Sequence, residues 1–334
     1  MAEQQNTDIL TLRNLKQYFP IDRTHAVRAV DGVSLSARRG ETLGLVGESG
    51  SGKSIIAYTV MGMYKATGGQ IFFDGQEIPS NTVKRSMAFK KNVQIVFQDP
   101  GSSLNPYQDV LQILSLPLMV HRIVPKDQIN KKILEILDMV ELPKNFLYKS
   151  PNNIGGGEKQ LVSIARALCS DPQFIILDEP TSSLDVSIQA KIINMLMKIQ
   201  AERQLTYMLI THDMGLMRNI SDRVAILYLG KICEIAPTES FYQNPLHPYT
   251  QMLLSAIPVV SDEEEALKPK RIRSTGEIPS PVNIPNGCSF NTRCFCKMAI
   301  CEQEDPKIRV TENGHCVRCH LFNDYPELVQ PELL

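Results

Sequence analysis

The chain has 334 residues, of which 43% are apolar and 21% charged, and this composition excludes an intrinsically disordered protein. Its 35 basic and 36 acidic residues give a net charge of −1, so no overall field favours nucleic acid, and we expect no nucleic-acid partner. No apolar run approaches the roughly 18 residues that span a bilayer. The first ten residues lack the basic and apolar regions of a secretory signal. We therefore expect a cytosolic protein whose contact with a membrane is made through a partner.

Residues 1–100 contain short apolar or alternating runs that predict strands. These runs are Leu10–Leu12, Val30–Leu35, Thr42–Val46, Gln70–Phe73 and Val93–Phe97. A helix is predicted from Ser54 to about Tyr64. Between residues 101 and 170 the apolar residues recur at helical spacing, which predicts a helical block.

Strand signals return between residues 174 and 236. The predicted strands are Phe174–Leu177, Thr206–Ile210, Arg223–Leu229 and Lys231–Ile235, and a helix over Ser187 to Arg203 lies between the first two. Strands that alternate with helices predict an α/β core with a largely parallel sheet, interrupted by the helical block. Prolines and charges in residues 258–287 predict a linker, and a cysteine-rich tail follows.

Residues 47–54 read GESGSGKS and fit the phosphate-loop pattern G-x-x-x-x-G-K-[ST] between a predicted strand and a predicted helix. Glycines let backbone N–H groups turn inward and approach phosphates closely. Lys53 would reach the β- and γ-phosphates of ATP, and Ser54 would ligate Mg²⁺. The predicted nucleotide-binding residues of this loop are Gly47, Glu48, Ser49, Gly50, Ser51, Gly52, Lys53 and Ser54.

A second motif places two carboxylates, Asp178 and Glu179, directly after the apolar run Phe174–Leu177. Ligands bind at the carboxyl ends of strands in α/β sheets. Asp178 could hold Mg²⁺ through water, and Glu179 could polarise an attacking water. Together with the phosphate loop, these acids predict a site for nucleoside-triphosphate hydrolysis.

Further short motifs follow in a fixed order. They are Gln98 at the end of a predicted strand, Ile154-Gly-Gly-Gly-Glu158 at the start of a helix, Ser183-Leu-Asp185, and Thr211-His212-Asp213. In order and spacing they resemble the Q-loop, signature, D-loop and H-loop of ATP-binding cassette (ABC) ATPases over about residues 8–257.

This resemblance implies an α/β fold of the P-loop NTPase (RecA-like) type, with an antiparallel β subdomain and an inserted helical subdomain. Residues 1–100 and 171–257 would form the ATP-binding core, and residues 101–170 the helical subdomain with the signature. Residues 258–334 would form the linker and a small metal-binding extension.

The resemblance also implies roles for single residues. Gln98 would sense Mg²⁺ and the attacking water and link the site to a membrane partner. His212 would contact the γ-phosphate, and Asp185 would act across a dimer interface. Phe19 aligns with the aromatic residue that stacks on adenine, and an ordinary core aromatic is the alternative.

Longer runs are similar to the ATPases of dipeptide and oligopeptide permeases, most of all to their F-type subunits. These runs are VRAVDGVSL at 27–35, VFQDPGSSLNP at 96–106, LDVSIQAKIINML at 184–196, NPLHPYTQMLLSAIP at 244–258 and PNGCSFNTRC at 285–294. The resemblance implies an ATPase subunit on the cytoplasmic face of the cell membrane that powers peptide uptake. Its implied partners are a D-type ABC ATPase in a heterodimer, two transmembrane permease subunits and an extracytoplasmic solute-binding protein. Uptake of glutathione or a metal chelate, or a soluble ABC ATPase, are the alternatives.

The signature departs from the family pattern LSGGQ. Gly155 replaces the serine that would bond the γ-phosphate, while Gly156 and Gly157 are retained, and Glu158 replaces glutamine. Because each signature in this family serves the partner's ATP, the change would weaken the partner's site. We therefore hypothesise two unequal sites, of which the one with Lys53 and Glu179 hydrolyses ATP. The alternative is that the backbone N–H groups of the glycines suffice.

Six of the eight cysteines lie in the last 47 residues, which in a reducing cytosol indicates a metal site rather than disulfides. Cys288, Cys294, Cys301 and Cys319 match the four cysteines of the family extension, which is associated with a [4Fe–4S] cluster. Zn²⁺ is the alternative, with Cys296, Cys316, His315 and His320 as further possible ligands, and free thiols are the third possibility.

Overall fold

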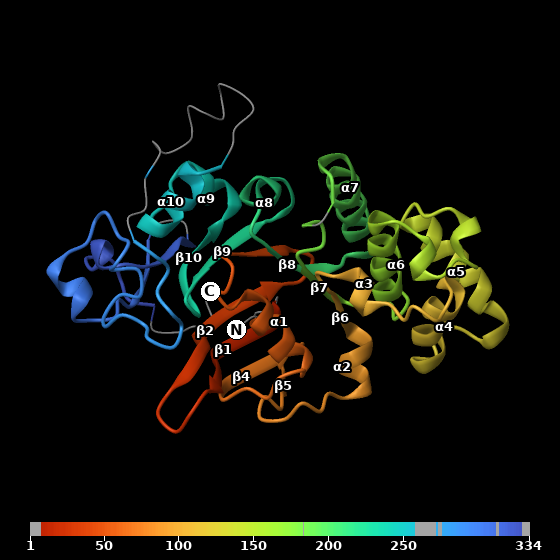
Figure 1. The fold of residues 1–334 in the computed structure, drawn as a ribbon, viewed down its shortest axis with the longest axis horizontal. Coiled ribbons are helices and arrows are strands. Elements are labelled where there is room, and N and C mark those ends of the chain that lie inside the picture. The colour runs from red at the N-terminus through yellow and green to blue at the C-terminus, as the bar shows by residue number, and fades with distance from the viewer. Residues whose placement is uncertain (1–7, 183, 258–271, 273–275, 312–313, 329–334) are drawn as a thin grey trace, which may run out of the picture. The chain divides into compact units, whose positions relative to one another are not determined.

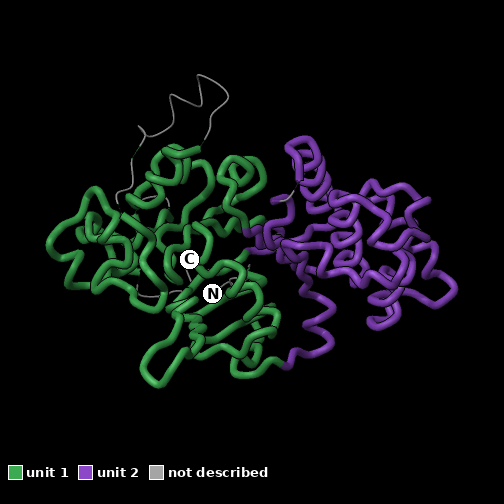
Figure 2. The backbone as a smooth tube through the Cα atoms, in the orientation of Figure 1, with its two compact units in different colours: residues 1–37, 42–83, 211–334 green, residues 38–41, 84–210 purple. Residues whose placement is uncertain are grey.

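The structure is a computed structural model that describes residues 8–182, 184–257, 272, 276–311 and 314–328 (Figure 1). The predicted D-loop residue Ser183 and most of the predicted linker lie outside the described residues. The chain forms two compact units (Figure 2). Unit 1 comprises residues 1–37, 42–83 and 211–334, and unit 2 comprises residues 38–41 and 84–210.

Unit 1 contains the first and the last of the described residues. Its main elements are β1 (Asp8–Pro20), β2 (Ala26–Arg38), β3 (Thr42–Val46), α1 (Lys53–Met61), β4 (Gly68–Phe73), β5 (Gln76–Ile78), α8 (Met214–Ile220), β9 (Arg223–Tyr228), β10 (Lys231–Pro237), α9 (Thr238–Gln243), α10 (Pro248–Ser255), β11 (Ile308–Val310) and β12 (Cys316–Arg318). Single 3-10 turns add Ala299–Glu302 and His320–Phe322.

Two groups of strands organise unit 1. Strands β2-β1-β4-β5 form a four-stranded sheet in which β4 is antiparallel to both β1 and β5. Strands β11-β12-β10-β9-β3 follow one another in a second sheet, where β3 and β9 are parallel. All residues of β3 and β9 are buried, as expected for parallel strands covered on both faces.

The C-terminal extension belongs to this second sheet, because β12 pairs with β10 and β11 pairs with β12. Both pairings are antiparallel, and so is that of β9 with β10. The expectation of a largely parallel sheet is therefore wrong for this part of the molecule. Leu229 and Gly230 join β9 to β10 and both have positive φ angles, 43° and 78°, which is the geometry of a tight two-residue hairpin.

Unit 2 combines three strands with most of the helices. Its elements are α2 (Met87–Asn92), β6 (Val93–Val96), α3 (Pro100–Ser103), α4 (Val110–Val120), α5 (Ile129–Met139), α6 (Gly156–Leu168), β7 (Phe174–Asp178), α7 (Val186–Arg203) and β8 (Thr206–Thr211, whose last residue is assigned to unit 1). Three short 3-10 turns lie at Lys126–Gln128, Lys144–Phe146 and Pro151–Asn153. Strands β6, β7 and β8 are parallel, as the sequence predicts.

A buried contact between Glu234 and His315 fixes the extension to the rest of unit 1. Glu234 on β10 has a fully buried side chain, and His315 Nε2 lies 2.5 Å from its Oε1. The same carboxylate accepts hydrogen bonds of 2.8 Å from the backbone N–H groups of Leu246 and His247. Glu234 therefore joins β10 to the segment before α10 and to the residue that precedes β12.

We expect Glu234→Ala to lower the free energy of unfolding by about 3–5 kcal/mol, because removing one partner leaves buried polar groups uncompensated. Denaturant unfolding of the full chain measures this change. Glu327→Ala is the matched control, because Glu327 pairs with Lys307 at 2.9 Å on the exposed surface of the same extension. Such a pair contributes at most about 1 kcal/mol. Equal losses in the two variants would contradict the prediction.

Candidate nucleotide-binding site

The loop of residues 47–54 lies in unit 1 between the carboxyl end of β3 and the start of α1. A Cβ atom at Gly47 would lie 2.2 Å from the carbonyl oxygen of Leu227, and one at Gly52 would lie 2.1 Å from that of Ala29. Gly52 also has a φ of +109°, which side chains rarely adopt. The loop therefore needs glycine at both positions because other backbone segments approach it closely.

Lys53 is buried, and its ammonium group points back into the loop. Its Nζ donates hydrogen bonds to the carbonyl oxygens of Gly47 (2.7 Å) and Glu48 (3.0 Å). Ser54 follows in the first turn of α1 and is half-buried. The loop thus curls around a cation at a helix N-terminus, an arrangement suited to binding phosphate.

Two further predicted residues lie in unit 1. Phe19 on β1 is half-buried, and its ring meets the edge of Tyr64, which follows α1, at a centroid distance of 5.1 Å. Phe19 is thus a partly accessible aromatic next to the phosphate-loop helix rather than a fully buried core residue. His212 is exposed after β8, and the next residue, Asp213, caps α8 by accepting from Leu216 N–H at 3.0 Å.

The two predicted acids of unit 2 end β7. Asp178 is fully buried, and Glu179 is half-buried with a φ of 45°. This left-handed conformation is uncommon for a side chain of this size and is typical of functional positions. Glu179 N–H donates to the carbonyl of Ile210 at 2.8 Å, which holds this backbone against β8.

The structure brings Gln98 and Glu179 together. Gln98 Nε2 donates a hydrogen bond of 2.9 Å to Glu179 Oε2. Gln98 is the second residue after β6, and Glu179 is the first residue after β7. Because β6 and β7 are adjacent parallel strands, both side chains lie at the carboxyl ends of neighbouring strands. An oriented, partly exposed carboxylate of this kind can act as a general base toward water.

The signature residues start helix α6. Gly155 is the N-cap and makes no side-chain cap, and a Cβ atom placed there would lie 2.5 Å from Glu158 Oε2. The Glu158 carboxylate therefore folds over the place that a serine side chain would fill. Gly156 and Gly157 form the first helical positions, and a Cβ at Gly157 would approach Ile188 Cγ2 at 3.2 Å.

Asp185 caps α7. Its Oδ1 accepts hydrogen bonds from Ile188 N–H (3.0 Å) and from the Ser187 hydroxyl (2.6 Å). These bonds, the one from Ser187 first, lower the pKa of the exposed carboxyl below its ordinary value. Asp185 therefore remains charged at neutral pH.

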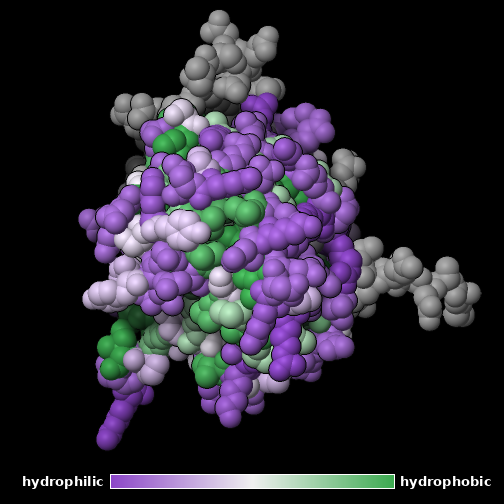
Figure 3. All heavy atoms as spheres, turned by 90° about the vertical axis from the view of Figure 1, so that its right-hand side faces the viewer, coloured by the Kyte–Doolittle hydropathy of each residue, from purple (hydrophilic) through white to green (hydrophobic). Residues whose placement is uncertain are grey.

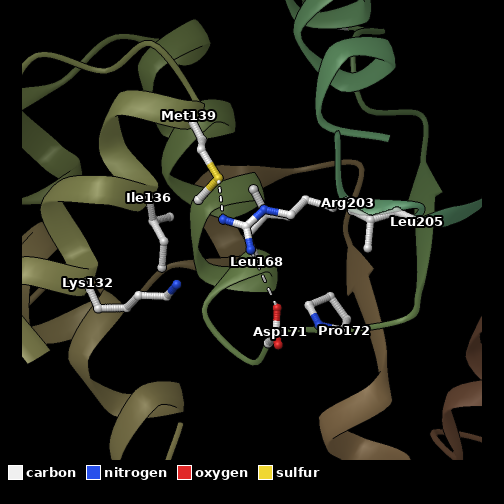
Figure 4. A pocket seen from close by; sticks show the side chains of 8 residues that line it. All are labelled: Lys132, Ile136, Met139, Leu168, Asp171, Pro172, Arg203 and Leu205. Carbon is white, nitrogen blue, oxygen red and sulfur yellow. Dashed lines mark hydrogen bonds and ion pairs between the residues drawn. The ribbon is translucent and has the colours of Figure 1, made fainter. Parts of the chain in front are cut away.

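A surface pocket of unit 2 contains none of the predicted nucleotide-binding residues (Figure 4). Its lining residues are Lys132, Ile136, Met139, Leu168, Asp171, Pro172, Arg203 and Leu205. Arg203 reaches both Asp171 (3.9 Å) and the sulfur of Met139 (3.3 Å), so its guanidinium bridges two walls of the pocket.

The four cysteines of the predicted cluster are neighbours in unit 1. Burial is the main cause that raises the pKa of Cys288 to about 11 and of Cys319 to about 12. The charges of Cys294 and Cys301 contribute to both shifts. By contrast, the raised pKa of Cys316, about 11, arises from burial with no contribution from another cysteine.

The two histidines that could also serve as metal ligands have other partners. His315 is paired with Glu234, and His320 Nε2 lies 2.9 Å from the carbonyl oxygen of Glu304. Over the residues that the structure describes, no group of three or more His, Cys, Asp or Glu side chains is arranged to hold a metal ion. The four thiols are thus close to one another without forming a ligand shell.

Two residues that the sequence did not point to, Arg293 and Tyr249, hold Glu48. Arg293 binds its carboxylate, and Tyr249 accepts a hydrogen bond of 3.0 Å from its backbone N–H. Tyr228 contacts both of these residues: its ring centroid lies 4.6 Å from that of Tyr249, and its hydroxyl accepts a hydrogen bond of 3.5 Å from Arg293. Arg293 and Tyr249 lie in the runs at 285–294 and 244–258, whose similarity to the family gives no sign of what these side chains contact.

Comparisons with known proteins agree with these motifs. A family profile described as ABC transporter matches residues 30–182, and one described as oligopeptide/dipeptide transporter, C-terminal region, matches residues 233–301. The chain is 45% identical to the oligopeptide transport ATP-binding protein AppF of Bacillus subtilis, covering 96% of this chain and 99% of that protein. It is 37% identical to the dipeptide transport ATP-binding protein DppF of Haemophilus influenzae, covering 95% and 97%.

Solved structures show the same fold. The ATP-binding cassette MJ0796, in a dimeric post-hydrolysis state bound to ADP and Pi, matches with a TM-score of 0.60 and 28% identity over 69% of this chain and 98% of that chain. CbiO1 from Clostridium perfringens, part of the ABC transporter complex CbiONQ, matches with a TM-score of 0.63 and 27% identity, over 72% and 92%.

No helix in the described part of the chain is both long and apolar enough to cross a membrane. The fold is that of a P-loop ABC ATPase with antiparallel and mixed sheets. Because relatives that are 37–45% identical cover at least 95% of it, the chain belongs to the family of ABC transporter ATP-binding proteins that carry an oligopeptide/dipeptide transporter C-terminal region.

Proposed function

We propose that this protein is the ATP-hydrolysing subunit of an ABC importer for di- and oligopeptides, working at the cytoplasmic face of the cell membrane. The observation that carries the proposal is the match along nearly the whole chain, C-terminal region included, to proteins named as oligopeptide and dipeptide transport ATP-binding proteins. Its partners would be two transmembrane permease subunits and an extracytoplasmic solute-binding protein that delivers the peptide.

The phosphate loop would bind ATP. Its backbone N–H groups and the Lys53 ammonium would hold the phosphates, and Phe19 would stack on the adenine. Mg²⁺ prefers oxygen ligands, and the Ser54 hydroxyl, the Gln98 side-chain carbonyl and the Asp178 carboxylate are donors of that kind. Bound Mg²⁺ would neutralise charge that develops on the phosphates during transfer.

Glu179 would act as the general base. Its hydrogen bond with Gln98 orients the carboxylate, which can then take a proton from the attacking water. His212 would contact the γ-phosphate. Because Gln98 contacts the base directly, a displacement of Gln98 would change the orientation of Glu179, and this gives a membrane partner a way to influence hydrolysis.

The helices of unit 2 offer a surface for such a partner. Figure 3 shows the side of the molecule that carries α4 and α5, where hydrophobic side chains are exposed among hydrophilic ones. Exposed apolar residues of this block are Tyr107, Leu116, Met119, Val120 and Tyr148. Apolar side chains gathered on a surface are typical of protein-binding sites, and we assign this block to contact with the permease subunits.

A second cassette would complete the ATPase. We propose a D-type partner in a heterodimer, in which the signature Gly155–Glu158 and Asp185 of this chain would serve the partner's ATP. The substitution at Gly155 favours two unequal sites, because a change in one signature affects only one of the two ATP molecules.

Co-expression and purification in mild detergent test the proposed function. The full chain should purify with two multi-span permease subunits and a second ABC ATPase. Proteoliposomes of this complex should take up a labelled oligopeptide only with ATP and the solute-binding protein. Uptake of glutathione or a metal chelate instead would replace the proposed solute, and recovery of ribosomal or DNA-bound partners without a permease would overturn the transporter function.

We also propose that Cys288, Cys294, Cys301 and Cys319 hold a [4Fe–4S] cluster, with Zn²⁺ as the alternative. Their mutual electrostatic influence supports this set, and the engagement of His315 and His320 elsewhere disfavours histidine ligands. Backbone N–H groups of Phe290, Cys296 and Leu321 donate to the sulfurs of Cys288, Cys294 and Cys319, and hydrogen bonds of this kind stabilise thiolates. The thiols would need to move closer together and lose their protons on metal binding.

Anaerobic purification followed by metal analysis tests this site. We expect about four iron atoms and four sulfides per chain, the content of one [4Fe–4S] cluster, and near-complete loss of iron in Cys301→Ser. Cys169→Ser is the matched control, because Cys169 is a buried cysteine of unit 2. Stoichiometric zinc without iron would replace the cluster by Zn²⁺, and absence of both metals would leave free thiols.

A further inference from the structure

An arginine of the C-terminal extension reaches the phosphate loop. Arg293 NH1 donates to Glu48 Oε2 at 2.7 Å, and NH2 donates to Glu48 Oε1 at 3.0 Å. Both residues belong to unit 1, although 245 positions separate them in the sequence. The two parallel bonds form a bidentate pair, the strongest common contact between a guanidinium and a carboxylate.

The surroundings of Arg293 show that this pair is built into the fold. The Arg293 side chain is only 6% exposed, and its guanidinium carbon lies 5.8 Å from the ring centroids of both Tyr228 and Phe290. Stacking on aromatic rings suits a planar guanidinium and limits its freedom before any bond to Glu48 forms. Exposed ion pairs lack such support.

Glu48 is held at its backbone as well. Its N–H donates to the Tyr249 hydroxyl at 3.0 Å, and its carbonyl accepts from Lys53 Nζ at 3.0 Å. Tyr249 is fully buried and packs against Phe290 at a centroid distance of 5.3 Å. The side chain, N–H and carbonyl of Glu48 therefore each have a fixed partner, and the partners of the first two come from the C-terminal part of the chain.

We propose that Arg293 is a positioning residue for nucleotide binding, which fixes the phosphate loop through Glu48 and neutralises a carboxylate that would otherwise repel phosphate. The inference rests on the proposed binding of ATP by this loop. Glu48 lies between Gly47 and the glycines that turn the loop, so an unpaired charge at this position would disfavour a bound triphosphate. A loop already held in its binding shape also loses less entropy when ATP binds.

The proposal gives the extension a direct part in ATP binding. In the segment that carries Arg293, Cys288 N–H donates a hydrogen bond of 2.9 Å to the carbonyl oxygen of Cys301. The backbone of the cysteine region therefore helps to hold the segment of Arg293 in place. Its contribution to the ATP site is then one side chain, and a single substitution can remove it.

Calorimetric titration of the full-length chain with MgATP tests this role. Arg293→Met should raise the Kd about tenfold, equivalent to about 1.4 kcal/mol. Arg293→Lys should give a smaller increase, because lysine keeps the charge but not the bidentate geometry. In the assembled complex, KM for ATP should rise while kcat is retained, since Gln98 and Glu179 are untouched.

A double-mutant cycle separates this role from a general structural one. Glu48→Gln combined with Arg293→Met should bind ATP no more weakly than Arg293→Met alone, because both changes break the same pair. Losses that simply add would overturn the proposal, since they would show that the two residues act independently.

Arg318→Met is the matched control. Arg318 also precedes a cysteine of the predicted set, and it donates to the carbonyls of Ile232 and Pro306 at 3.2 Å without contacting the phosphate loop. It should keep the wild-type Kd. An equal loss in Arg318→Met would overturn the proposal by showing that any damage to the extension weakens binding. If Arg293→Met does not fold, Arg293→Lys and the Glu48→Gln arm still decide the question.

Failure of the two proposals can be told apart. A wild-type chain that does not bind MgATP would contradict the proposed function itself. A wild-type chain that binds, with an unchanged Kd in Arg293→Met, would contradict only the role of Arg293.

Discussion

Glu179→Gln is expected to lower ATP hydrolysis by the assembled importer by about 10²- to 10⁴-fold, the range typical of losing a general base. Glutamine keeps the shape of the side chain, and its carbonyl can still accept the hydrogen bond that Gln98 now donates at 2.9 Å. The variant should therefore bind ATP as wild type does and fail only in activating water.

Phosphate release and calorimetric ATP titration measure the two properties separately. Glu141→Gln is the matched control, because Glu141 is an exposed acid of unit 2 that pairs with Lys191 at 3.5 Å. Retention of most of the ATPase rate in Glu179→Gln would contradict the base role. It would also contradict the hypothesis that this chain's own site performs most of the hydrolysis.

Restoring the family signature is expected to accelerate the other ATP site. We predict that Gly155→Ser with Glu158→Gln raises its turnover about 10- to 150-fold, the equivalent of one charge-assisted hydrogen bond of about 1.5–3 kcal/mol. The second substitution is needed because Glu158 Oε2 lies 2.5 Å from the position of the new Cβ and places a negative charge there. Serine is also a good N-cap residue, so α6 should retain its stability.

The measurement is best made in the Glu179→Gln background. This chain's own site is then inactive, so any increase in phosphate release reports the site that the signature serves. Gly155→Ala with Glu158→Gln is the control, because it adds the Cβ without the hydroxyl. Equal rates in the serine and alanine variants would favour the alternative that the backbone N–H groups of the glycines suffice.

Nine strands could be predicted from local apolar or alternating runs in the sequence. Runs such as Thr42–Val46 and Phe174–Leu177 are mainly apolar because all residues of strands β3 and β7 are buried. Strand β5 and the strands of the extension escaped prediction because each has only three residues, too few for a periodic pattern. Strands β1 and β2 also extend beyond the predicted runs, since buried or half-buried residues alternate there with polar ones and give no continuous apolar run.

The candidate site also has features that the sequence predicts and features that it does not. The phosphate loop and the acids after β7 were predictable because their chemistry fixes residue types at short spacings. The hydrogen bond between Gln98 and Glu179 could not be predicted, because residue types and spacing do not fix the distance between two side chains that lie 81 positions apart. The contact of Arg293 with Glu48 was not predictable, because 245 positions separate the two residues and no local pattern links them.

The pairing of β3 with β9 has a consequence for biosynthesis. Strand β3 ends at Val46, and its parallel neighbour begins only at Arg223. At about 5–20 residues per second, translation takes roughly 10 to 35 seconds to cover the interval between them. Residues 84–210, which make up nearly all of unit 2, leave the ribosome in that time and can fold first. During this interval the edge of β3 that later pairs with β9 has no partner. We therefore expect chaperones that bind nascent chains to bind the apolar residues of β3.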